Sequence, residues 1–345
     1  MHHIPHPTSH ISHPTAPRCF TIDVEDLYHT QAARPLCPPH TWDQQPARLE
    51  QTLDQLLELL DQYQTKATLF VLGHAAKRHP QLAPRAAALG HEIASHGHNH
   101  TTLNQLTPHQ FKQDLLTAKH RLEDQTGQPV LGYRAPSFSL TPHTAHWAAP
   151  LIAQTGHTYD SSIFPTTLRK THAFPHAPTT PFPLLQYLKQ TLSTSNIEHR
   201  TSDIQELPPL TYQLHTPLKH FQKQKPAEAK GFCAALPAAG GAYLRFFPTA
   251  YTAAALKQAA LHHRPAILYT HPWELDHTAP RFPLPFKQRI RTYHNQHKLL
   301  HRFHRLLSRF PATPTSPWLT CAQLAQPLTT GHPASAGRGL TKSAA

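Results

Sequence analysis

His96 and His100 are the pair of residues whose types and spacing most directly suggest chemistry in this sequence. Four residues apart on a helix or a single turn, two imidazoles lie on one face and can hold one cation. Imidazole is a borderline-soft ligand, so zinc is the expected metal, with cobalt and nickel as alternatives. Chance is the competing explanation, because the chain has 32 histidines among 345 residues. The metal hypothesis therefore depends on what the rest of the sequence supplies.

Three carboxylates, Asp23, Glu25 and Asp26, stand together at the end of a predicted strand. Left unpaired they would repel one another, and a divalent cation removes that cost. One of them can ligate a metal together with the two histidines, while another stays free as a general base. Two imidazoles and one carboxylate leave a coordination position open for water, as in catalytic metal sites. The alternative is a solvated acidic turn.

Strand and helix patterns alternate between residues 18 and 310. Short β-rich runs predict strands, and apolar residues at three- and four-residue spacing predict helices. The predicted strands are 18–24, 66–72, 91–95, 129–134, 158–161, 205–207, 242–247 and 265–271. The predicted helices are 48–62, 80–89, 108–126, 142–154, 249–262 and 286–310. Repeated strand-then-helix units predict an α/β fold with a parallel sheet, and their number predicts a distorted (β/α) barrel of about seven strands.

Polar residues fall at the ends of these predicted strands. In (β/α) barrels the chemistry sits on loops at the carboxyl ends of the strands. The residues found there are Asp23, His96, Arg134, Asp160 and His271. This coincidence favours an active site more strongly than any single motif does.

The composition predicts one barrel domain with low-complexity ends. We expect disorder in residues 1–17, a domain over 18–325 with an insertion at 165–205, and a flexible tail over 326–345. No run of about 18 apolar residues predicts a membrane span. No apolar signal region is visible, so a cytoplasmic location is expected. Four widely separated cysteines without a Cys-x-x-Cys motif predict free thiols in a reducing compartment.

The formal net charge of +13 favours anionic partners. A solvated basic surface is the simpler interpretation, and without an aromatic-interleaved basic motif or zinc-finger spacing nucleic acid is not the expected partner. The basic helix predicted at 286–310 could lie against an anionic membrane that carries a lipid-linked glycan. The favoured alternative is a helix that packs its apolar face on the barrel.

Five motifs in order give the chain, over roughly residues 18–320, a resemblance to the NodB-homology polysaccharide deacetylases of carbohydrate esterase family 4. Its details look closest to the branch found beside exosortase-type exopolysaccharide gene clusters. The segments that resemble the family motifs are Asp23–Asp26, Ser95–His100, Gly132–Pro136, Tyr159–Ser162 and Leu268–Pro272. In the commonest first motif two aspartates are adjacent, whereas here Val24 and Glu25 separate Asp23 from Asp26. The carboxylate ligand is therefore either Glu25 or Asp26.

The resemblance implies metal-assisted hydrolysis of an acetamide. It implies that His96 and His100 bind the metal, that Asp23 is the base, and that His271 is the general acid that protonates the leaving amine. Arg134 is expected to fix Asp23 through a bidentate contact.

The remaining site residues are expected on the substrate side. A backbone amide of the 133–138 loop is expected to help hold the oxyanion. Asp160 is a candidate to orient His271, with a turn role as the alternative. Aromatic residues such as Tyr133 and Trp273 can stack on sugar rings, although such residues more often belong to the core. The predicted substrate contacts are Tyr133, Pro136, Asp160 and Trp273.

Three functions remain open at the level of the sequence. The first is N-deacetylation of N-acetylhexosamine units in a bacterial exopolysaccharide, with an N-acetylated polysaccharide or lipid-linked oligosaccharide as substrate. The second is another hydrolase on the same fold, either a peptidoglycan deacetylase or an allantoinase-like amidohydrolase. The third is a basic protein that binds nucleic acid or acidic glycan without catalysis.

Overall fold

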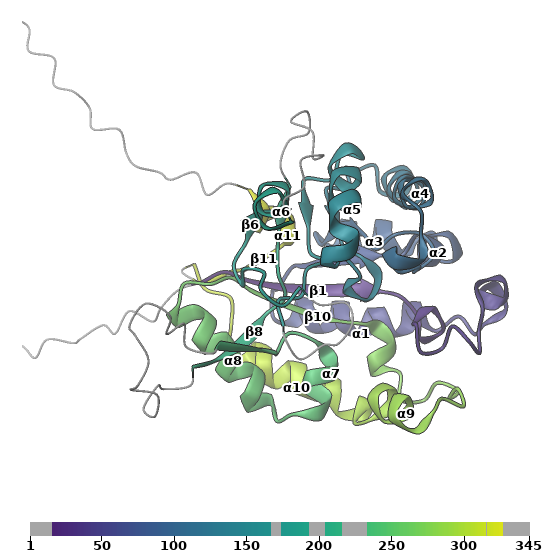
Figure 1. The fold of residues 1–345 in the computed structure, drawn as a ribbon. Helices are drawn as coiled ribbons and strands as arrows, with labels where there is room; N and C mark the ends of the chain where they lie inside the picture. Colours follow the sequence, from purple (N-terminus) through teal and green to yellow (C-terminus); the bar gives the residue numbers. More distant parts are fainter. Residues whose placement is uncertain (1–15, 167–173, 193–203, 216–232, 315, 327–345) are drawn as a thin grey trace, which may run out of the picture.

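The computed structural model describes residues 16–166, 174–192, 204–215, 233–314 and 316–326 (Figure 1). Nearly all of the N-terminal segment predicted to be disordered, and nearly all of the predicted tail, lie outside these residues. The predicted insertion at 165–205 is described in part.

A curled, mainly parallel sheet forms the centre of the molecule (Figure 1). Seven strands follow one another in parallel in the order β10-β1-β2-β3-β4-β5-β7. Their bounds are Ala266–Thr270, Arg18–Val24, Ala67–Val71, Glu92–Ser95, Gly132–Tyr133, Tyr159–Asp160 and Gln205–Glu206. At the far edge β6 (Phe182–Pro183) pairs antiparallel with β7, and β11 (Trp318–Leu319) pairs with β1. Beyond β7, the Leu210 N–H donates to the Ile267 carbonyl of β10 over 2.9 Å. The predicted distorted barrel with about seven strands is confirmed.

Helices surround this sheet, and most of them pack an apolar face into the core. They are α1 (Leu49–Gln62), α2 (Gly73–Arg78), α3 (Leu82–Ala88), α4 (Pro108–Thr126), α5 (Pro142–Gln154), α6 (Leu184–Leu192), α7 (Gly241–Phe246), α8 (Thr249–Leu261), α9 (Phe286–Tyr293), α10 (Gln296–Arg309) and α11 (Cys321–Ala325). Strands β8 (Thr211–His215) and β9 (Cys233–Pro237) pair antiparallel in a separate two-stranded sheet.

Local sequence signals set the bounds of the longest helix. The Thr107 hydroxyl accepts from the Gln110 N–H over 3.2 Å at the start of α4, and Pro108 occupies the first turn, where no N–H is needed. Gly127 ends the helix at φ 66°, in the left-handed conformation that glycine adopts without strain. The predicted helix 108–126 matches α4 for these reasons.

The segment predicted as a strand at 242–247 is instead helix α7, so that prediction is wrong. The alternation of apolar residues there resembles a strand, but Gly240 begins a helical turn, and α7 packs its Leu244 into the core.

The single helix predicted at 286–310 is two helices. Asn295 has a left-handed φ of 52°, so the chain changes direction there between the end of α9 and the start of α10. The buried face of α10 contains Leu299, Phe303 and Leu306, and the Phe303 ring meets Phe20 of β1 edge-on, with centroids 5.2 Å apart. Packing on the barrel, the favoured expectation for this segment, holds for α10.

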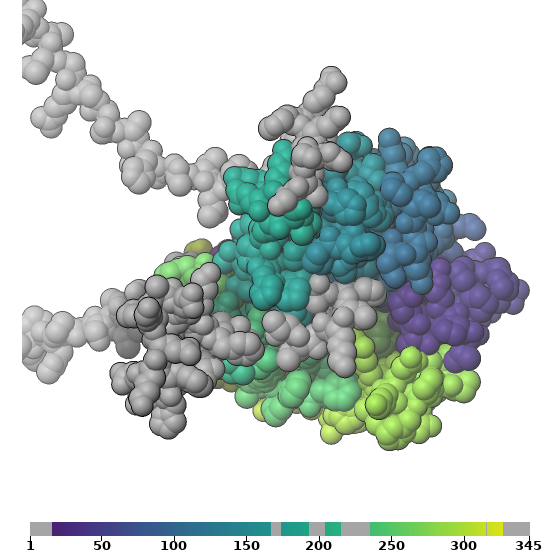
Figure 2. Space-filling view, viewed as in Figure 1, coloured from purple at the N-terminus to yellow at the C-terminus, as the bar shows by residue number. Residues whose placement is uncertain are grey.

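Helix α9 lies beside the segment that follows β1. Figure 2 shows the yellow-green α9 region next to the purple N-terminal residues, and Phe282 packs against the cluster of Tyr28, Cys37 and Trp42. This contact brings a late part of the chain to the carboxyl end of β1. In the described part of the chain, every helix is too short or too polar to cross a bilayer.

Candidate active site

A cavity of about 350 Å³ opens at the carboxyl ends of β1, β3 and β10. Each of these strands delivers polar side chains to it, because parallel strands place their carboxyl ends at the same edge of the sheet. The predicted residues that line it are Asp23, Glu25, His96, His100, His271 and Trp273. The segment after β1 and helix α9 also line it, through Gln31 and Thr292 among others.

Glu25, His96 and His100 form a buried group whose nitrogen and oxygen donors all lie within 4.8 Å of one another. Nε2 of His100 lies 2.8 Å from Oε2 of Glu25. Nδ1 of His96 lies 2.8 Å from the Arg134 carbonyl oxygen. Because a carbonyl oxygen can only accept, Nδ1 carries the proton, and Nε2 of His96 is left as the ligand atom.

Two nitrogen donors and one carboxylate oxygen suit zinc, cobalt or nickel, so the residues present fit a divalent metal. Burial lowers the pKa of His96 to about 4, which keeps the imidazole neutral, as a ligand must be. Burial acts to raise the pKa of Glu25, but the neighbouring imidazoles, His100 foremost, bring this pKa well below its usual range. Glu25 and His96 are therefore in ligand-competent protonation states at neutral pH.

The two histidines lie on a turn after β3, which Asp114 of α4 holds in place. The Asp114 carboxylate accepts from the backbone N–H of His98 over 2.7 Å and of Asn99 over 3.1 Å. Gly97 has φ 73°, and a Cβ at this position would lie 2.6 Å from the Asp114 carboxylate. Glycine is therefore needed here for both the conformation and the space. The four-residue spacing of His96 and His100 therefore brings them together on a turn, one of the two alternatives that the sequence left open, and not on a helix.

Asp26 lies apart from the metal-binding group. Residues two apart on a strand share a face, so Asp23 and Glu25 point together into the cavity and Asp26 points elsewhere. Its carboxyl is hydrogen-bonded to Tyr28, and burial raises its pKa to about 7. Of the two carboxylates left open by the sequence, the structure places Glu25 with the histidines and corrects the predicted donor set by leaving Asp26 out.

Arg134 anchors Asp23 in the floor of the cavity. Its Nη1 donates to Oδ1 of Asp23 over 2.6 Å and to the Thr21 hydroxyl over 2.8 Å. Its other nitrogens donate to the carbonyl and hydroxyl oxygens of Ser161, and its guanidinium lies 4.0 Å from the centroid of the Phe70 ring. The predicted contact exists, but it is made through one nitrogen rather than two. Oδ2 of Asp23 is left to face His271.

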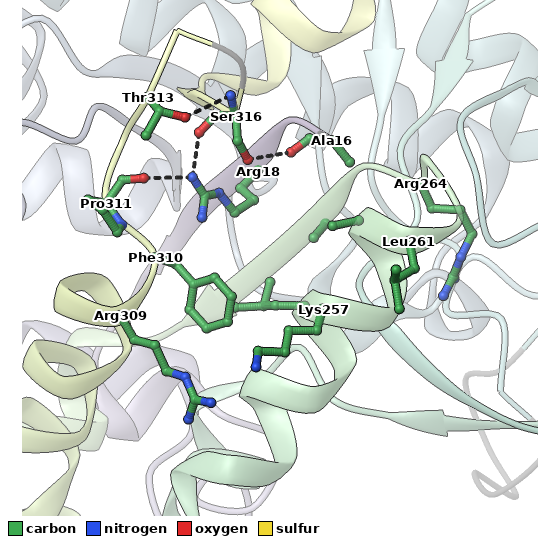
Figure 3. A pocket seen from close by; sticks show the side chains of 13 residues that line it. Ala16, Arg18, Lys257, Leu261, Arg264, Arg309, Phe310, Pro311, Thr313 and Ser316 are labelled. Atoms are coloured by element: carbon green, nitrogen blue, oxygen red, sulfur yellow. Dashed lines mark hydrogen bonds between the residues drawn. The ribbon is translucent and has the colours of Figure 1, made fainter. Parts of the chain in front are cut away.

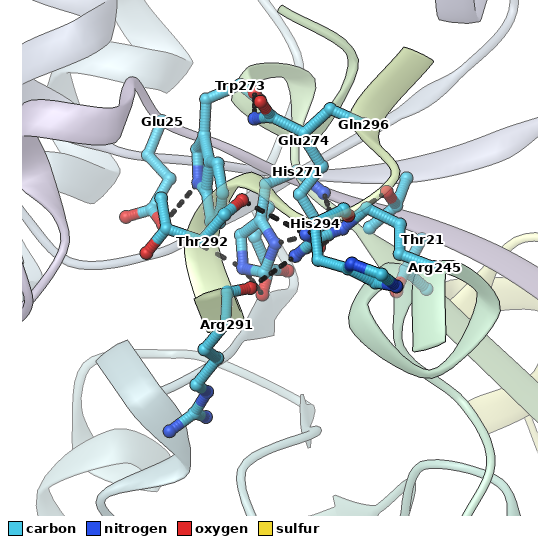
Figure 4. A network of polar contacts seen from close by, with 12 residues as sticks. Thr21, Glu25, Arg245, His271, Trp273, Glu274, Arg291, Thr292, His294 and Gln296 are labelled. Carbon is cyan, nitrogen blue, oxygen red and sulfur yellow. Dashed lines mark hydrogen bonds and ion pairs between the residues drawn. The ribbon is translucent and has the colours of Figure 1, made fainter. Parts of the chain in front are cut away.

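His271 follows β10 and faces both carboxylates. Its Nε2 lies 3.8 Å from Oδ2 of Asp23 and 3.8 Å from Oε1 of Glu25. Its Nδ1 lies 3.2 Å from Oε2 of Glu274, three residues later on a 3-10 turn (Figure 4). Burial acts to lower the pKa of His271, but Glu274 and the two facing carboxylates raise this pKa to about 9. The imidazole is therefore protonated at neutral pH.

Arg245 completes this network from helix α7. Its Nη2 and Nε donate to Oε1 of Glu274 over 2.9 and 3.2 Å. Its Nη1 and Nη2 also donate to carbonyls around the end of α9, including that of Thr292 at 3.0 Å (Figure 4). Although burial opposes ionisation, Arg245 and His271 lower the pKa of Glu274 to about 2. Gly241 allows the approach, since a Cβ there would lie 2.2 Å from Oε2 of Glu274.

Glu274 performs the role that the sequence suggested for Asp160. Asp160 is fully buried between Ser162 and Glu206: the Ser162 hydroxyl donates to its Oδ1 over 2.5 Å, and its carboxyl is hydrogen-bonded to that of Glu206. The structure therefore corrects its predicted role. Sequence reasoning missed Glu274, although its position three residues after His271 was a usable signal.

Trp273 alone among the four predicted substrate contacts lines the cavity. Its ring stacks on His271, with centroids 5.3 Å apart, and its indole N–H donates to Glu25 over 3.4 Å. Tyr133 and Pro136 are buried, and Tyr133 packs in the core against Phe111. Because both side chains are buried outside the cavity, Tyr133 and Pro136 are not the substrate contacts that the sequence predicted. The cavity wall instead contains residues that the sequence did not indicate as contacts: Gln31, Ser137, Tyr269, Gln288 and Arg291.

Two family models match the chain, side by side. Residues 39–157 match the polysaccharide deacetylase family, and residues 161–320 match a domain of unknown function, DUF3473. The first match includes the histidine turn and Arg134, and the second includes His271, Glu274 and Arg245. The cavity is thus assembled from both regions and from β1, which precedes them.

Similar curated proteins are glycan deacetylases. A peptidoglycan-N-acetylglucosamine deacetylase of Bacillus cereus is 34% identical over 82 residues, which are 24% of this chain and 38% of that protein. A chitooligosaccharide deacetylase of a Bradyrhizobium species is 33% identical over 82 residues, which are 24% of this chain and 37% of that protein. The chain spans less than two fifths of the length of these relatives.

Similar solved structures show the same fold. A protein from Mycobacterium smegmatis assigned as a polysaccharide deacetylase superposes with a TM-score of 0.56 at 20% identity and covers 92% of both chains. The PuuE allantoinase superposes with a TM-score of 0.54 at 16% identity, over 96% of this chain and 95% of that chain. At these identities the likeness establishes the fold alone.

These comparisons show that part of the chain is similar to polysaccharide deacetylases. Residues 39–157 match the polysaccharide deacetylase family, and the similar curated proteins include deacetylases of peptidoglycan and of chitooligosaccharides. The predicted enzyme class agrees with these matches. The family is generally metal-dependent, which agrees with the Glu25, His96 and His100 group.

Proposed function

We propose that this protein removes acetyl groups from N-acetylhexosamine units of a bacterial exopolysaccharide, with a divalent metal, zinc first, held by Glu25, His96 and His100. The observation that carries the proposal is the meeting of three metal donors, an anchored carboxylate and a protonated imidazole in one cavity. A binding protein without catalysis has no need of this arrangement.

The bound metal would polarise the acetamide carbonyl and acidify water. Asp23 acts as the base through Oδ2, because Arg134 already occupies Oδ1. As water adds to the carbonyl carbon, its proton passes to Asp23. His271 then gives the proton on Nε2 to the amide nitrogen as the C–N bond breaks, so that the sugar leaves as an amine and acetate is released.

The two groups to which we assign the proton transfers face each other in the cavity. Oδ2 of Asp23 and Nε2 of His271 lie 3.8 Å apart, so both can reach the same reacting amide. The stacked ring of Trp273 forms an apolar wall beside His271, on which a sugar ring can lie.

The exopolysaccharide substrate rests on the resemblance of the Asp23–Asp26 segment and of the later motifs to that branch of the family. A lipid-linked oligosaccharide is the second form of this substrate that we consider. A peptidoglycan deacetylase is the rival enzyme, favoured by the matched Bacillus cereus relative. For contact with an anionic membrane, α9 offers Phe286 and Ile290, 65% and 40% exposed, among basic residues.

Acetate release tests the proposal. Purified protein incubated with N-acetylglucosamine oligomers, peptidoglycan fragments and allantoin should release acetate from the oligomers and leave allantoin unopened. Asp23→Asn should abolish release, whereas Asp43→Asn, a change at an exposed aspartate outside the cavity, should not. Chelation should remove activity and added zinc should restore it. Full activity in Asp23→Asn would overturn the catalytic proposal, and cleavage confined to peptidoglycan fragments would favour the rival enzyme.

A further inference from the structure

A second cavity, of about 550 Å³, lies at the amino ends of β1 and β10, at the opposite end of the sheet from the candidate active site. Arg18 and Ala266, the first residues of these strands, pair in register, and both line it. Asp23 stands five positions after Arg18 on β1, a distance of about 16 Å along a strand. The two cavities share no lining residue, so this one is not an extension of the active site.

The walls of this cavity combine cations with apolar side chains (Figure 3). Helix α8 supplies Lys257 and Leu261, and the end of α10 and the residue after it supply Arg309 and Phe310. Figure 3 shows the charged ends of Lys257 and Arg309 on the same side of the Phe310 ring. The complete lining set is Ala16, Arg18, Leu256, Lys257, Ala260, Leu261, Arg264, Ala266, Arg309, Phe310, Pro311, Thr313 and Ser316, and it contains no acid.

Three of the cations that line this cavity have no acidic partner in the described part of the chain. Arg18, Lys257 and Arg309 form no ion pair with an acid among the described residues. Between residues 240 and 326 the sequence has eleven Lys and Arg side chains but two acids, Glu274 and Asp276, and both lie at the other end of the barrel. A cluster of cations beside apolar surface raises the local concentration of anions.

Arg18 adds a buried donor that is left unsatisfied. Its Nη2 donates to the Pro311 carbonyl over 2.9 Å and also to the Ser316 carbonyl, so the side chain is anchored. Its Nε is buried without a hydrogen-bond partner in the described part of the chain. Burial lowers the pKa of Arg18 to about 10, and the guanidinium therefore stays charged at neutral pH. The anchored guanidinium therefore adds a fixed positive charge to the wall of the cavity.

We propose that this cavity binds a phosphate-bearing amphiphile, with the phosphate at Lys257 and Arg309 and the apolar part against Leu261 and Phe310. A phosphate offers several oxygens to cations that come from different elements, and such charge-assisted contacts are strong. The apolar part removes Leu261, which is 63% exposed, from water. A neutral hydrocarbon would leave the cations without partners, and inorganic phosphate would leave the apolar wall exposed.

Calorimetric titration of the full chain tests whether binding needs both the phosphate and the apolar part of the ligand. The probes are dodecyl phosphate below its micelle concentration, inorganic phosphate, and the neutral dodecyl maltoside. We expect saturable binding of dodecyl phosphate, with at least tenfold weaker binding of the other two. Arg309→Glu and Lys257→Glu should each weaken dodecyl phosphate binding at least tenfold, and Leu261→Ser should weaken dodecyl phosphate but not inorganic phosphate.

Lys112→Glu on α4 is the matched control, because it makes the same charge change at an exposed site that lines neither cavity. It should bind dodecyl phosphate as the unmodified protein does. Equal losses in Lys112→Glu and Arg309→Glu would show that net charge alone attracts the probe and would overturn the proposal. Equal affinity for inorganic phosphate, or for the neutral maltoside, would overturn it as well. Acetate release should be unchanged in Arg309→Glu, so this test is independent of the proposed catalysis.

Discussion

Glu274 sets the protonation of the proposed general acid, and its replacement by glutamine gives the sharpest test of the site. Oε2 of Glu274 lies 3.2 Å from Nδ1 of His271 and also accepts the His271 backbone N–H over 3.2 Å. Glutamine keeps the shape and an oxygen acceptor but removes the charge. Since Glu274 is the foremost group that raises the pKa of His271 to about 9, Glu274→Gln should lower this pKa toward its ordinary value of 6.5.

The size of the effect follows from the two pKa values. With a pKa of about 9, about 97% of His271 is protonated at pH 7.5; with a pKa of 6.5, about 9% is protonated, a roughly tenfold loss of the active acid. A general acid works while it holds its proton, so kcat/KM of the unmodified protein should fall as the pH rises through about 9. In Glu274→Gln the same fall should occur about 2.5 pH units lower, near pH 6.5, and activity should recover below pH 6.

The assay is acetate release from an N-acetylglucosamine oligomer between pH 5 and 10. Asp276→Asn is the matched control, because Asp276 follows the same 3-10 turn but pairs with Arg48 rather than His271, and its profile should keep the fall near pH 9. Thermal unfolding of both variants checks the fold, since Glu274→Gln also removes the charge that pairs with Arg245. A fall that stays near pH 9 in Glu274→Gln, or a loss of activity that is equal at every pH, would refute the assignment of Glu274.

Four further outcomes are expected. Glu25→Gln should lower zinc affinity at least tenfold, whereas Asp26→Asn should leave it near that of the unmodified protein; equal losses by metal titration would contradict the donor set. Asp114→Ala should weaken zinc binding by about tenfold, because the turn that presents His96 and His100 loses two hydrogen bonds to its backbone. Unchanged zinc affinity would show that the turn keeps its conformation without Asp114. Gly241→Ala should lower the free energy of unfolding by about 1–3 kcal/mol in urea titration, because its Cβ would meet Glu274 at 2.2 Å. Since the folded pKa of His271 is raised, its contribution to stability should be complete below pH 6.5 and should disappear as the pH rises through about 9; unfolding free energies that are flat across this range would contradict the raised pKa.

Local patterns in the sequence predicted most of the elements that carry the site. The strand 18–24 and the helices 108–126 and 142–154 match β1, α4 and α5 because their signals are local: alternation, a capping threonine, an early proline. The prediction of a strand at 242–247 was wrong because a short apolar run fits a strand and a helix equally well, and tertiary packing decides between them.

The sequence by itself determined the chemistry that the cavity can perform. Imidazoles four residues apart and acids at a strand end specify a metal and a base wherever the chain brings them together, and the alternation of strands and helices brings them to one edge of a sheet. Which carboxylate joins the histidines was decided by the tertiary structure, which turns Glu25 inward with Asp23 and buries Asp26 beside Tyr28.

The partner of His271 was also decided by the tertiary structure. Glu274 is near in sequence, but its charge is held in place by Arg245, which reaches it from α7 across 29 positions of the chain. Asp160, the partner of His271 that the sequence suggested, is instead buried and hydrogen-bonded to Glu206. Spacing along the chain determines which groups can share one turn. Contacts between distant segments determine which buried charges face each other. The reason is that a buried charge needs a partner, and for these residues only the tertiary fold brings the partner close.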